Sequence, residues 1–312
     1  MKNTIFDYQN SEEQHMIAIR RVTLAAVVVC SMASFTFGDI TATFEAPDYN
    51  GSAAGVQLTD WLGGGAAAQQ GWYAPSDSDD YFVYTYADNP FGMTAVNPTG
   101  GDQFAAGPRV ENLTKYGRGQ HDEVLTAGLP VLYGFDFNGK CLLEDPTVTA
   151  GYIGSFSVQP SGENHNVLFN WKDPGVTYSL MHQANDAAGA ALASPGVVAF
   201  DDLAADHWYR QEMILDFASN RVVQATLTDL ETMAQTTITP EGWYLKGGDT
   251  RPPEWELPTA FRMFSFRNSE TTANMMAFDN VTVQSIPEPS TFFLLGAGAV
   301  FVILALRRRR TA

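Results

Sequence analysis

Two pairs of carboxylates have the spacing that sugar-cleaving enzymes use. Such enzymes place two acidic side chains beside the scissile bond, and residues i and i+2 of a strand point to the same face. Asp229 with Glu231, and Glu254 with Glu256, have this spacing. The first pair ends a predicted strand, and the second follows two prolines, where a regular central strand is not expected. A glycoside hydrolase or polysaccharide lyase is therefore only an alternative, and we predict a protein that is not an enzyme.

Two predicted loops carry aspartate clusters that suit a hard cation. Ca²⁺ takes roughly six to eight oxygen ligands, mostly carboxylates and carbonyls. The clusters are Asp77, Asp79 and Asp80 in one loop and Asp201, Asp202 and Asp206 in another. The first is our candidate for a structural Ca²⁺ site. Because no EF-hand or calcium repeat is present, solvated loop charge is the alternative, and no other cofactor is predicted.

Aromatic side chains in predicted loops are candidates for stacking on sugar rings, whose apolar faces suit flat aromatic groups. These residues are Trp72, Tyr73, Trp243, Tyr244 and Trp255. The alternative is that they belong to the core, where most aromatic residues lie. The four histidines of the body, in contrast, have no metal-ligand spacing, so no transition-metal site is predicted. They are His121, His165, His182 and His207.

The elements that must position these residues are strands. Alternating apolar and polar residues bounded by Gly, Pro, Asn or Asp predict strands. These are residues 40–44, 81–86, 131–137, 152–158, 167–171, 176–181, 208–217, 261–266 and 275–283. Residues 51–78 resemble a loop, and only Asn185 to Ala193 could form a short helix. The sequence thus predicts an all-β protein with one antiparallel β-sandwich.

The clearest hairpin spans residues 208–227. Met213 and Leu215 belong to an apolar face of the first strand, while Arg210 and Glu212 point to the other face. Ala218-Ser219-Asn220 turns the chain. On the return strand we expect Val223, Ala225 and Leu227 to restore the apolar face.

Both ends carry targeting signals. Arg20 and Arg21 precede an apolar run and then small residues, which is the order of a secretory signal peptide. We predict a signal peptide over residues 1–38, with Met16 as an alternative start. The body, residues 39–286, then has 31 acidic and 11 basic residues and a net charge of −20. Such a surface repels nucleic acid, and the single Cys141 excludes an internal disulfide.

The C-terminal segment, residues 287–312, combines three features. Pro287, Glu288, Pro289, Ser290 and Thr291 form a linker that the prolines keep out of a helix. The 17 residues 290–306 carry no charge and predict one membrane helix at the short end of the required length. Arg307, Arg308, Arg309 and Arg310 follow and place this end in the cytoplasm, so the body lies outside it.

This order of Pro-Glu-Pro motif, apolar helix and arginine cluster resembles the PEP-CTERM sorting signal of exopolysaccharide-producing Gram-negative bacteria. The resemblance covers less than a tenth of the chain. It implies an exosortase-type membrane protease as partner, cleavage near residues 287–289, and transfer of the body to the cell surface or extracellular matrix. Export by the Sec machinery and anchoring in the inner membrane, with the body in the periplasm, would precede that step.

A second, more diffuse resemblance concerns the body. The pattern His207-Trp208-Tyr209, a long amphipathic hairpin and then Phe278-Asp279-Asn280-Val281 is similar to concanavalin A-like jelly rolls of the laminin-G and lectin type. It implies a jelly-roll fold and no particular ligand residues.

The leading hypothesis is therefore an exported, non-enzymatic surface or matrix protein associated with exopolysaccharide. A lectin-like carbohydrate-binding module is the alternative.

Overall fold

The structure is a computed structural model that describes residues 40–59, 68–74, 81–107, 117–143, 151–159, 164–249, 257–265 and 272–286. All regular secondary structure in these ranges is β-strand, which confirms the all-β prediction. No helix in them is long and apolar enough to cross a bilayer. The predicted signal peptide, residues 1–38, and the predicted membrane helix, residues 290–306, lie outside the described residues.

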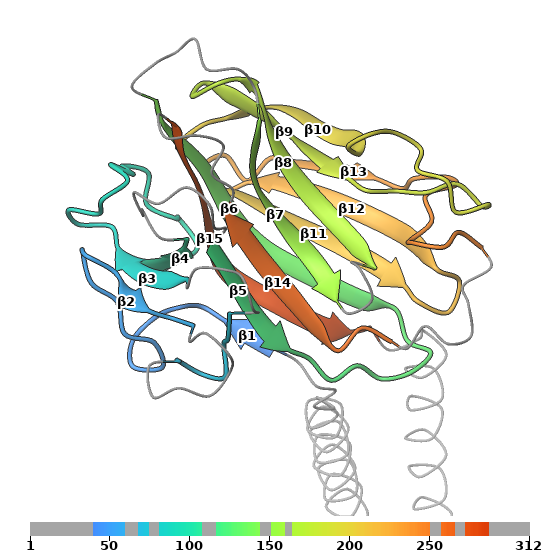
Figure 1. Ribbon diagram of the computed structural model, residues 1–312, viewed down its shortest axis with the longest axis horizontal. Coiled ribbons are helices and arrows are strands. Elements are labelled where there is room, and N and C mark those ends of the chain that lie inside the picture. Colours follow the sequence, from blue (N-terminus) through green and yellow to red (C-terminus); the bar gives the residue numbers. More distant parts are fainter. Residues whose placement is uncertain are drawn as a thin grey trace, which may run out of the picture. The chain divides into compact units, whose positions relative to one another are not determined.

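The strands form two antiparallel sheets, whose order can be followed in Figure 1. The nine-stranded sheet runs β13 (Gln235–Ile238), β12 (Arg221–Asp229), β11 (Tyr209–Asp216), β6 (Val131–Leu143), β15 (Thr272–Ser285), β4 (Gln103–Ala106), β3 (Phe82–Thr85) and β2 (Val56–Gln57), and β1 (Ile40–Ala42) also pairs with β15. The six-stranded sheet runs β10 (Val197–Ala204), β9 (Thr177–His182), β8 (His165–Asp173), β7 (Tyr152–Gln159), β14 (Ala260–Ser265) and β5 (Gly117–Asp122).

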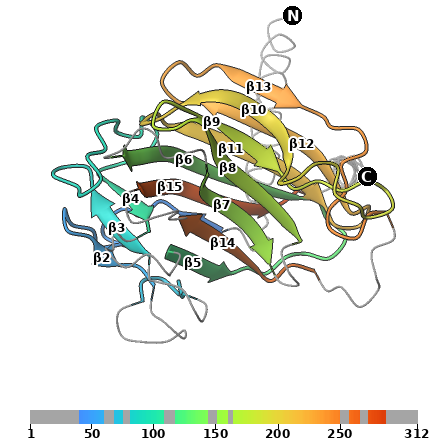
Figure 2. The ribbon, with the colours of Figure 1, turned by 45° about the horizontal axis from the view of Figure 1, so that its top comes forward.

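Aromatic side chains fill the space between the two sheets. Phe135 of β6 stacks on Phe156 of β7 with ring centroids 4.3 Å apart, and Phe137 lies 4.8 Å from Phe169 of β8. All four rings are completely buried. Figures 1 and 2 both show β7, β8 and β14 stacked on β6, β11 and β15. Two facing antiparallel sheets with one shared apolar core fit the predicted β-sandwich.

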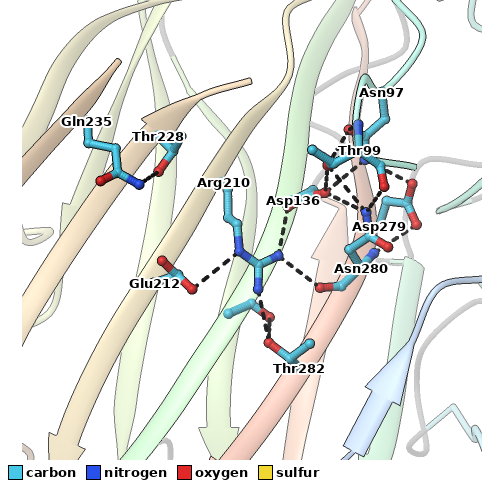
Figure 3. A network of polar contacts seen from close by, with 11 residues as sticks. Asn97, Thr99, Asp136, Arg210, Glu212, Thr228, Gln235, Asp279, Asn280 and Thr282 are labelled. Atoms are coloured by element: carbon cyan, nitrogen blue, oxygen red, sulfur yellow. Dashed lines mark hydrogen bonds and ion pairs between the residues drawn. The ribbon is translucent and has the colours of Figure 1, made fainter. Parts of the chain in front are cut away.

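A buried polar network joins a loop to the outer face of the nine-stranded sheet (Figure 3). The Nδ2 atom of Asn97 donates to both Asp136 and Asp279 at 2.9 Å, and Arg210 donates to Asp136 at 2.9 Å. Burial and the neighbouring Asp136 carboxylate raise the pKa of Asp279 well above its usual range. Because these contacts join Asn97 of the loop to side chains of three strands, we interpret the network as an anchor for the loop.

The predicted short helix over Asn185 to Ala193 is wrong. Both Ala188 and Ala190 donate backbone N–H groups to Oδ1 of Asp186 at 2.9 Å, and Gly189 adopts a φ of +83°. The aspartate side chain therefore stabilises a turn in place of the helix that the alanines favour. The segment expected to be a loop, residues 51–78, also contains the short strand β2.

The predicted turn and the two faces of β11 are as expected, but the return strand differs. The register shifts between Ile214 and Leu215, where Ile214 pairs with Gln224 but Leu215 pairs with Val222. Val222 is consequently 2 % exposed and Val223 is 40 % exposed. The expectation that Val223 lies on the apolar face is wrong because a β-bulge inserts one residue and reverses the alternation at that point.

Candidate functional site

Five polar side chains lie side by side on the face of the six-stranded sheet that points away from the core. Gln120 pairs with Arg262, Arg262 with Ser157, and Ser157 with Asn166, and paired residues share a face of the sheet. The Nδ2 atom of Asn166 donates to Oε1 of Gln183 at 3.1 Å. We call these five residues, Gln120, Arg262, Ser157, Asn166 and Gln183, the polar row. Ser157 and Asn166 in its middle are buried, and the other three are half-buried. None of the five is acidic, although the whole chain carries a net charge of −17.

Phe264 lies next to the row, and the guanidinium groups of two arginines lie over its ring. The guanidinium carbons of Arg262 and Arg118 lie 4.3 and 4.6 Å from the centroid of its ring. Both arginines are half-buried, and Phe264 is buried. The ring attracts the guanidinium groups through its negative face, so it gathers positive charge at one place on this sheet.

Tyr73 extends the hydrogen bonding at the β5 end of the row. Its hydroxyl accepts from Nε2 of Gln120 at 2.6 Å and donates to Oδ1 of Asp122 at 2.9 Å. Burial, followed by the hydrogen bond to Asp122, raises the pKa of Tyr73 to about 12. The phenol therefore keeps its proton at neutral pH and fixes the orientation of the Gln120 amide.

The other end of the row opens into a pocket of about 470 Å³. That volume is within the range of roughly 300–1,000 Å³ found for small-molecule sites. Four amide side chains line it, together with Tyr152, His165, Lys246 and five small residues. The amides belong to Asn164, Asn166, Gln183 and Asn185, so two members of the polar row also line the pocket. Amide groups both donate and accept, which suits hydroxyl groups of a ligand.

Two loops enclose the pocket and hold each other. The backbone N–H groups of Asn185 and Tyr244 each donate to the other residue's carbonyl at 2.9 Å, and Lys246 N–H donates to the Asn164 carbonyl at 3.1 Å. At Gly248, with a φ of +74°, an added Cβ would lie 2.4 Å from the Ala187 carbonyl oxygen. A glycine is therefore required for the close approach of the two loops.

Two histidines that are 17 positions apart in the sequence meet beneath this region. Nε2 of His165 lies 2.9 Å from Nδ1 of His182, and both rings are buried. Burial lowers the pKa of His165 to about 3 and that of His182 well below its usual range, so both rings are neutral at physiological pH. Across the described ranges, no group of three or more His, Cys, Asp or Glu could hold a metal ion.

The aromatic residues that were predicted to stack on sugars differ in their exposure. Trp72 is completely buried and donates from Nε1 to the Tyr49 hydroxyl at 3.2 Å, and Tyr244 is 7 % exposed beneath the guanidinium of Arg221. The expectation that these two rings are available to a ligand is wrong, because packing against other side chains covers them. Tyr73 and Trp243 are half-buried. Trp255 lies outside the described residues.

The predicted acidic residues that the structure describes contact basic side chains. Asp229, the last residue of β12, and Glu231, in the turn that follows, flank His207 at 3.2 and 3.4 Å. In the second aspartate cluster, Asp201 and Asp202 both contact Lys172 at 2.8 Å, whereas Asp206 contacts Lys140 at 2.7 Å. These three carboxylates therefore have cationic partners.

The remaining acidic candidates, Asp77, Asp79, Asp80, Glu254 and Glu256, lie outside the described residues. The Ca²⁺ site at Asp77, Asp79 and Asp80 stays a prediction, which a thermal melt with and without chelator tests.

Sequence reasoning missed the polar row because β5 lacks an apolar pattern. Its sequence is Gly-Arg-Gly-Gln-His-Asp. A Cβ added at Gly119 would lie 3.3 Å from Cε of Met263 and 3.4 Å from Tyr81, so neighbouring side chains fill the inward positions that apolar residues usually occupy. The alternation of Arg118 and Gln120 with glycine was the only signal for this strand.

Comparison with known proteins adds one specific match. Residues 285–310 carry a PEP-CTERM protein-sorting motif, as the sequence predicted. The chain thus joins a β-sandwich to a C-terminal sorting motif. No curated protein has a matching sequence.

Several solved structures resemble the chain at low identity. An alginate lyase of family PL-14 from Aplysia kurodai is 10 % identical, with a TM-score of 0.39, 62 % of this chain and 87 % of that chain covered. An alginate lyase from Pseudomonas aeruginosa is 9 % identical, with a TM-score of 0.36 and coverages of 69 % and 86 %. Lectin II from Ulex europaeus is 10 % identical, with a TM-score of 0.37 and coverages of 59 % and 87 %. At TM-scores below 0.5 none of these likenesses bears on activity.

Proposed function

We propose that this chain is an exported, non-enzymatic protein of the cell surface or extracellular matrix that associates with exopolysaccharide. The observation that carries the proposal is the sorting motif at residues 285–310. A sorting motif implies export and processing at a membrane. In this proposal the signal peptide directs Sec export, the C-terminal helix holds the body at the inner membrane with the sandwich in the periplasm, and an exosortase-type protease then releases or transfers it.

The end of the fold supports processing after the body has folded. The last strand, β15, ends at Ser285, and Ile286 donates its N–H to the Pro130 carbonyl at 2.7 Å. The Pro-Glu-Pro sequence starts at the next residue. Cleavage there would leave every paired residue of β15 in place.

Replacement of Pro287, Glu288 and Pro289 by alanine tests this proposal. We expect the variant to keep its C-terminal segment and to stay in the membrane fraction, which mass spectrometry of the cell-associated and released chains would show. Replacement of Pro240 and Glu241 by alanine is the matched control, because these residues form a Pro-Glu pair after β13 and outside the motif. An unchanged mature mass and location for the motif variant would overturn the sorting proposal.

A carbohydrate-binding module is the second candidate, and the pocket of about 470 Å³ with its four amide side chains favours it. Glycan arrays and pull-down with the organism's own polysaccharide distinguish it from a protein that is held in the matrix by other contacts. A glycosidase or lyase is a third candidate, which turnover of those polymers would reveal. Substitution of Asp229 and Glu231 would then test whether that pair acts in it.

A further inference from the structure

We propose that the pocket between the two loops binds one uncharged sugar residue at the end of a polysaccharide chain. The inference rests on the proposed association with exopolysaccharide, and it names the site and the ligand chemistry. A sugar ring carries hydroxyl groups around its edge and C–H groups on its two faces. A pocket that holds such a ring must combine hydrogen-bonding groups with an apolar wall. The pocket of about 470 Å³ has both.

The hydrogen-bonding groups come from side chains that solvent reaches, at the end of β9 and in the loop that follows. Oε1 of Gln183 accepts from Asn166 at 3.1 Å, and Nδ2 of Asn185 donates to the Tyr244 carbonyl at 3.5 Å. Within the described residues, the Nε2 atom of Gln183, the Oδ1 atom of Asn185 and the Ser194 hydroxyl have no further partner. They provide a donor, an acceptor and a group that does both, which suits sugar hydroxyl groups.

The loop after β9 builds the apolar wall. Its small residues line the pocket: Ala184, Ala191, Ala193 and Pro195. The chain's own hydrogen bonds fold this loop, because Leu192 donates its N–H to the Ala184 carbonyl at 3.0 Å and Asp186 donates to the Ala190 carbonyl at 2.8 Å. A wall that is already ordered loses little conformational entropy when a ligand binds.

The charges around the pocket favour a neutral ligand. None of its described lining residues is acidic, and Lys246 already contacts another protein group. The ring of His165 is neutral, because burial lowers its pKa to about 3. A charged sugar would therefore lose hydration in the pocket without gaining a counter-charge. The net charge of −17 also repels anionic polymers over a longer range.

The paired loops determine which part of a sugar chain can enter the pocket. Asn185 and Tyr244 exchange two backbone hydrogen bonds of 2.9 Å, and Lys246 donates its N–H to the Asn164 carbonyl at 3.1 Å. These bonds join the two loops to each other and to the start of β8, so they close one side of the pocket. A terminal sugar enters from the open side, while the rest of the chain stays in solvent.

Ligand-observed saturation-transfer NMR tests the proposal on the full chain, kept in a detergent that has no sugar head group. The probes are the methyl glycosides of glucose, galactose and mannose, each in both anomeric forms, and methyl glucuronide as the charged counterpart of equal size. We expect at least one neutral glycoside to bind in the millimolar range, and methyl glucuronide to bind about tenfold more weakly or less.

A length series tests whether the pocket takes a chain end. The probes are linear oligomers of the sugar that binds, from the dimer to the hexamer. We expect the affinity per mole of oligomer to stay within about twofold, because only the terminal residue makes contacts that stabilise the complex. Saturation transfer should likewise be confined to the signals of that residue.

Variants then locate the site. Ala193→Trp fills the pocket from an exposed position and should abolish binding, whereas Ala188→Trp, in the same loop but outside the lining, should keep it. Gln183→Glu keeps the oxygen that accepts from Asn166 but loses the amide donor, and should weaken binding about tenfold. Ser194→Ala removes one hydroxyl and should weaken binding about threefold. Melting curves of each variant show whether it is folded.

Several results would overturn the inference. Binding that survives both Ala193→Trp and Gln183→Glu would place the site outside the pocket. Equal binding of methyl glucuronide would remove the selection by charge, and an affinity that rises with oligomer length would show a groove in place of an end site. Binding of none of the neutral glycosides would reject the pocket as a sugar site. Pull-down with the organism's own polysaccharide would still measure the association with exopolysaccharide separately.

Discussion

Glu123 shows how a single buried carboxylate can make stability depend on pH. It is 5 % exposed, and its Oε1 accepts from the Tyr133 hydroxyl at 2.9 Å. Burial raises the pKa of Glu123 from 4.5 to about 8. Because the folded chain holds this proton more tightly than the unfolded chain, the stabilisation is complete below about pH 4.5 and is lost as the pH rises to about 8.

Glu123→Gln should therefore remove the pH dependence of the free energy of unfolding between about pH 4.5 and 8. Glutamine can still accept from Tyr133 but has no proton to lose. We expect the free energy of unfolding of the wild type to fall, relative to the variant, by up to about 1.4 kcal/mol per pH unit in this window. Urea unfolding at a series of pH values measures it, with the exposed Glu241→Gln as control. Parallel curves for the wild type and Glu123→Gln would refute the assignment.

At the scale of elements, the hairpin of β11 and β12 depends on its bulge. A hydrogen bond to a neighbouring loop fixes the residue beside the inserted Val223, since Val222 donates its N–H to the Trp243 carbonyl at 3.0 Å. The register shift turns the Val222 side chain inward and Val223 outward. Simple alternation from Leu227 and Ala225 would reverse the two positions.

The two valines therefore form a matched pair of variants. Val222→Asp places a carboxylate in the core and should cost about 3 kcal/mol or more, because a buried unpaired charge loses its hydration. Val223→Asp faces solvent and should change stability by only about 0.5 kcal/mol. Denaturant unfolding of both variants measures the two losses of stability. A larger loss for Val223→Asp would mean that the strand keeps strict alternation.

At the scale of the whole molecule, β15 is a central strand and also the last one before the sorting motif. It pairs with β6, β4 and β1, and Val281 and Val283 near its end are completely buried. The body therefore needs the chain up to about residue 285, and no further requirement is visible in the ranges that the structure describes.

Two truncations test where the folded body ends. A chain that ends at Ile286 should melt within about 2 °C of the full chain, since it keeps every pair of β15. A chain that ends at Asn280 loses both valines and the pairing with β1, and should lose roughly 3–6 kcal/mol from valine burial alone. Thermal melts followed by circular dichroism compare them. A large loss in the chain ending at Ile286 would show that the sorting segment contributes to the fold.

Several features could be predicted from the sequence because they are local. The pattern that places Met213 and Leu215 on one face and Arg210 and Glu212 on the other predicted β11. The turn at Asn220 followed from short-range turn chemistry. The candidate site could not be found in this way. Residues 185–193 form a turn and not the predicted helix, because the Asp186 side chain accepts hydrogen bonds from the backbone. The amphipathic pattern of the hairpin likewise did not indicate the bulge that buries Val222.

By itself the sequence determined the all-β class and the sorting motif of residues 285–310, since both are encoded in contiguous residues. Only the tertiary structure decided that Trp72 belongs to the core and that Gln120, Arg262, Ser157, Asn166 and Gln183 form one row. Four of them lie in four different strands, and Gln183 follows the end of β9. Together they span more than half of the body. Only the register of antiparallel pairing, which depends on long-range contacts, brings them to one face of the sheet.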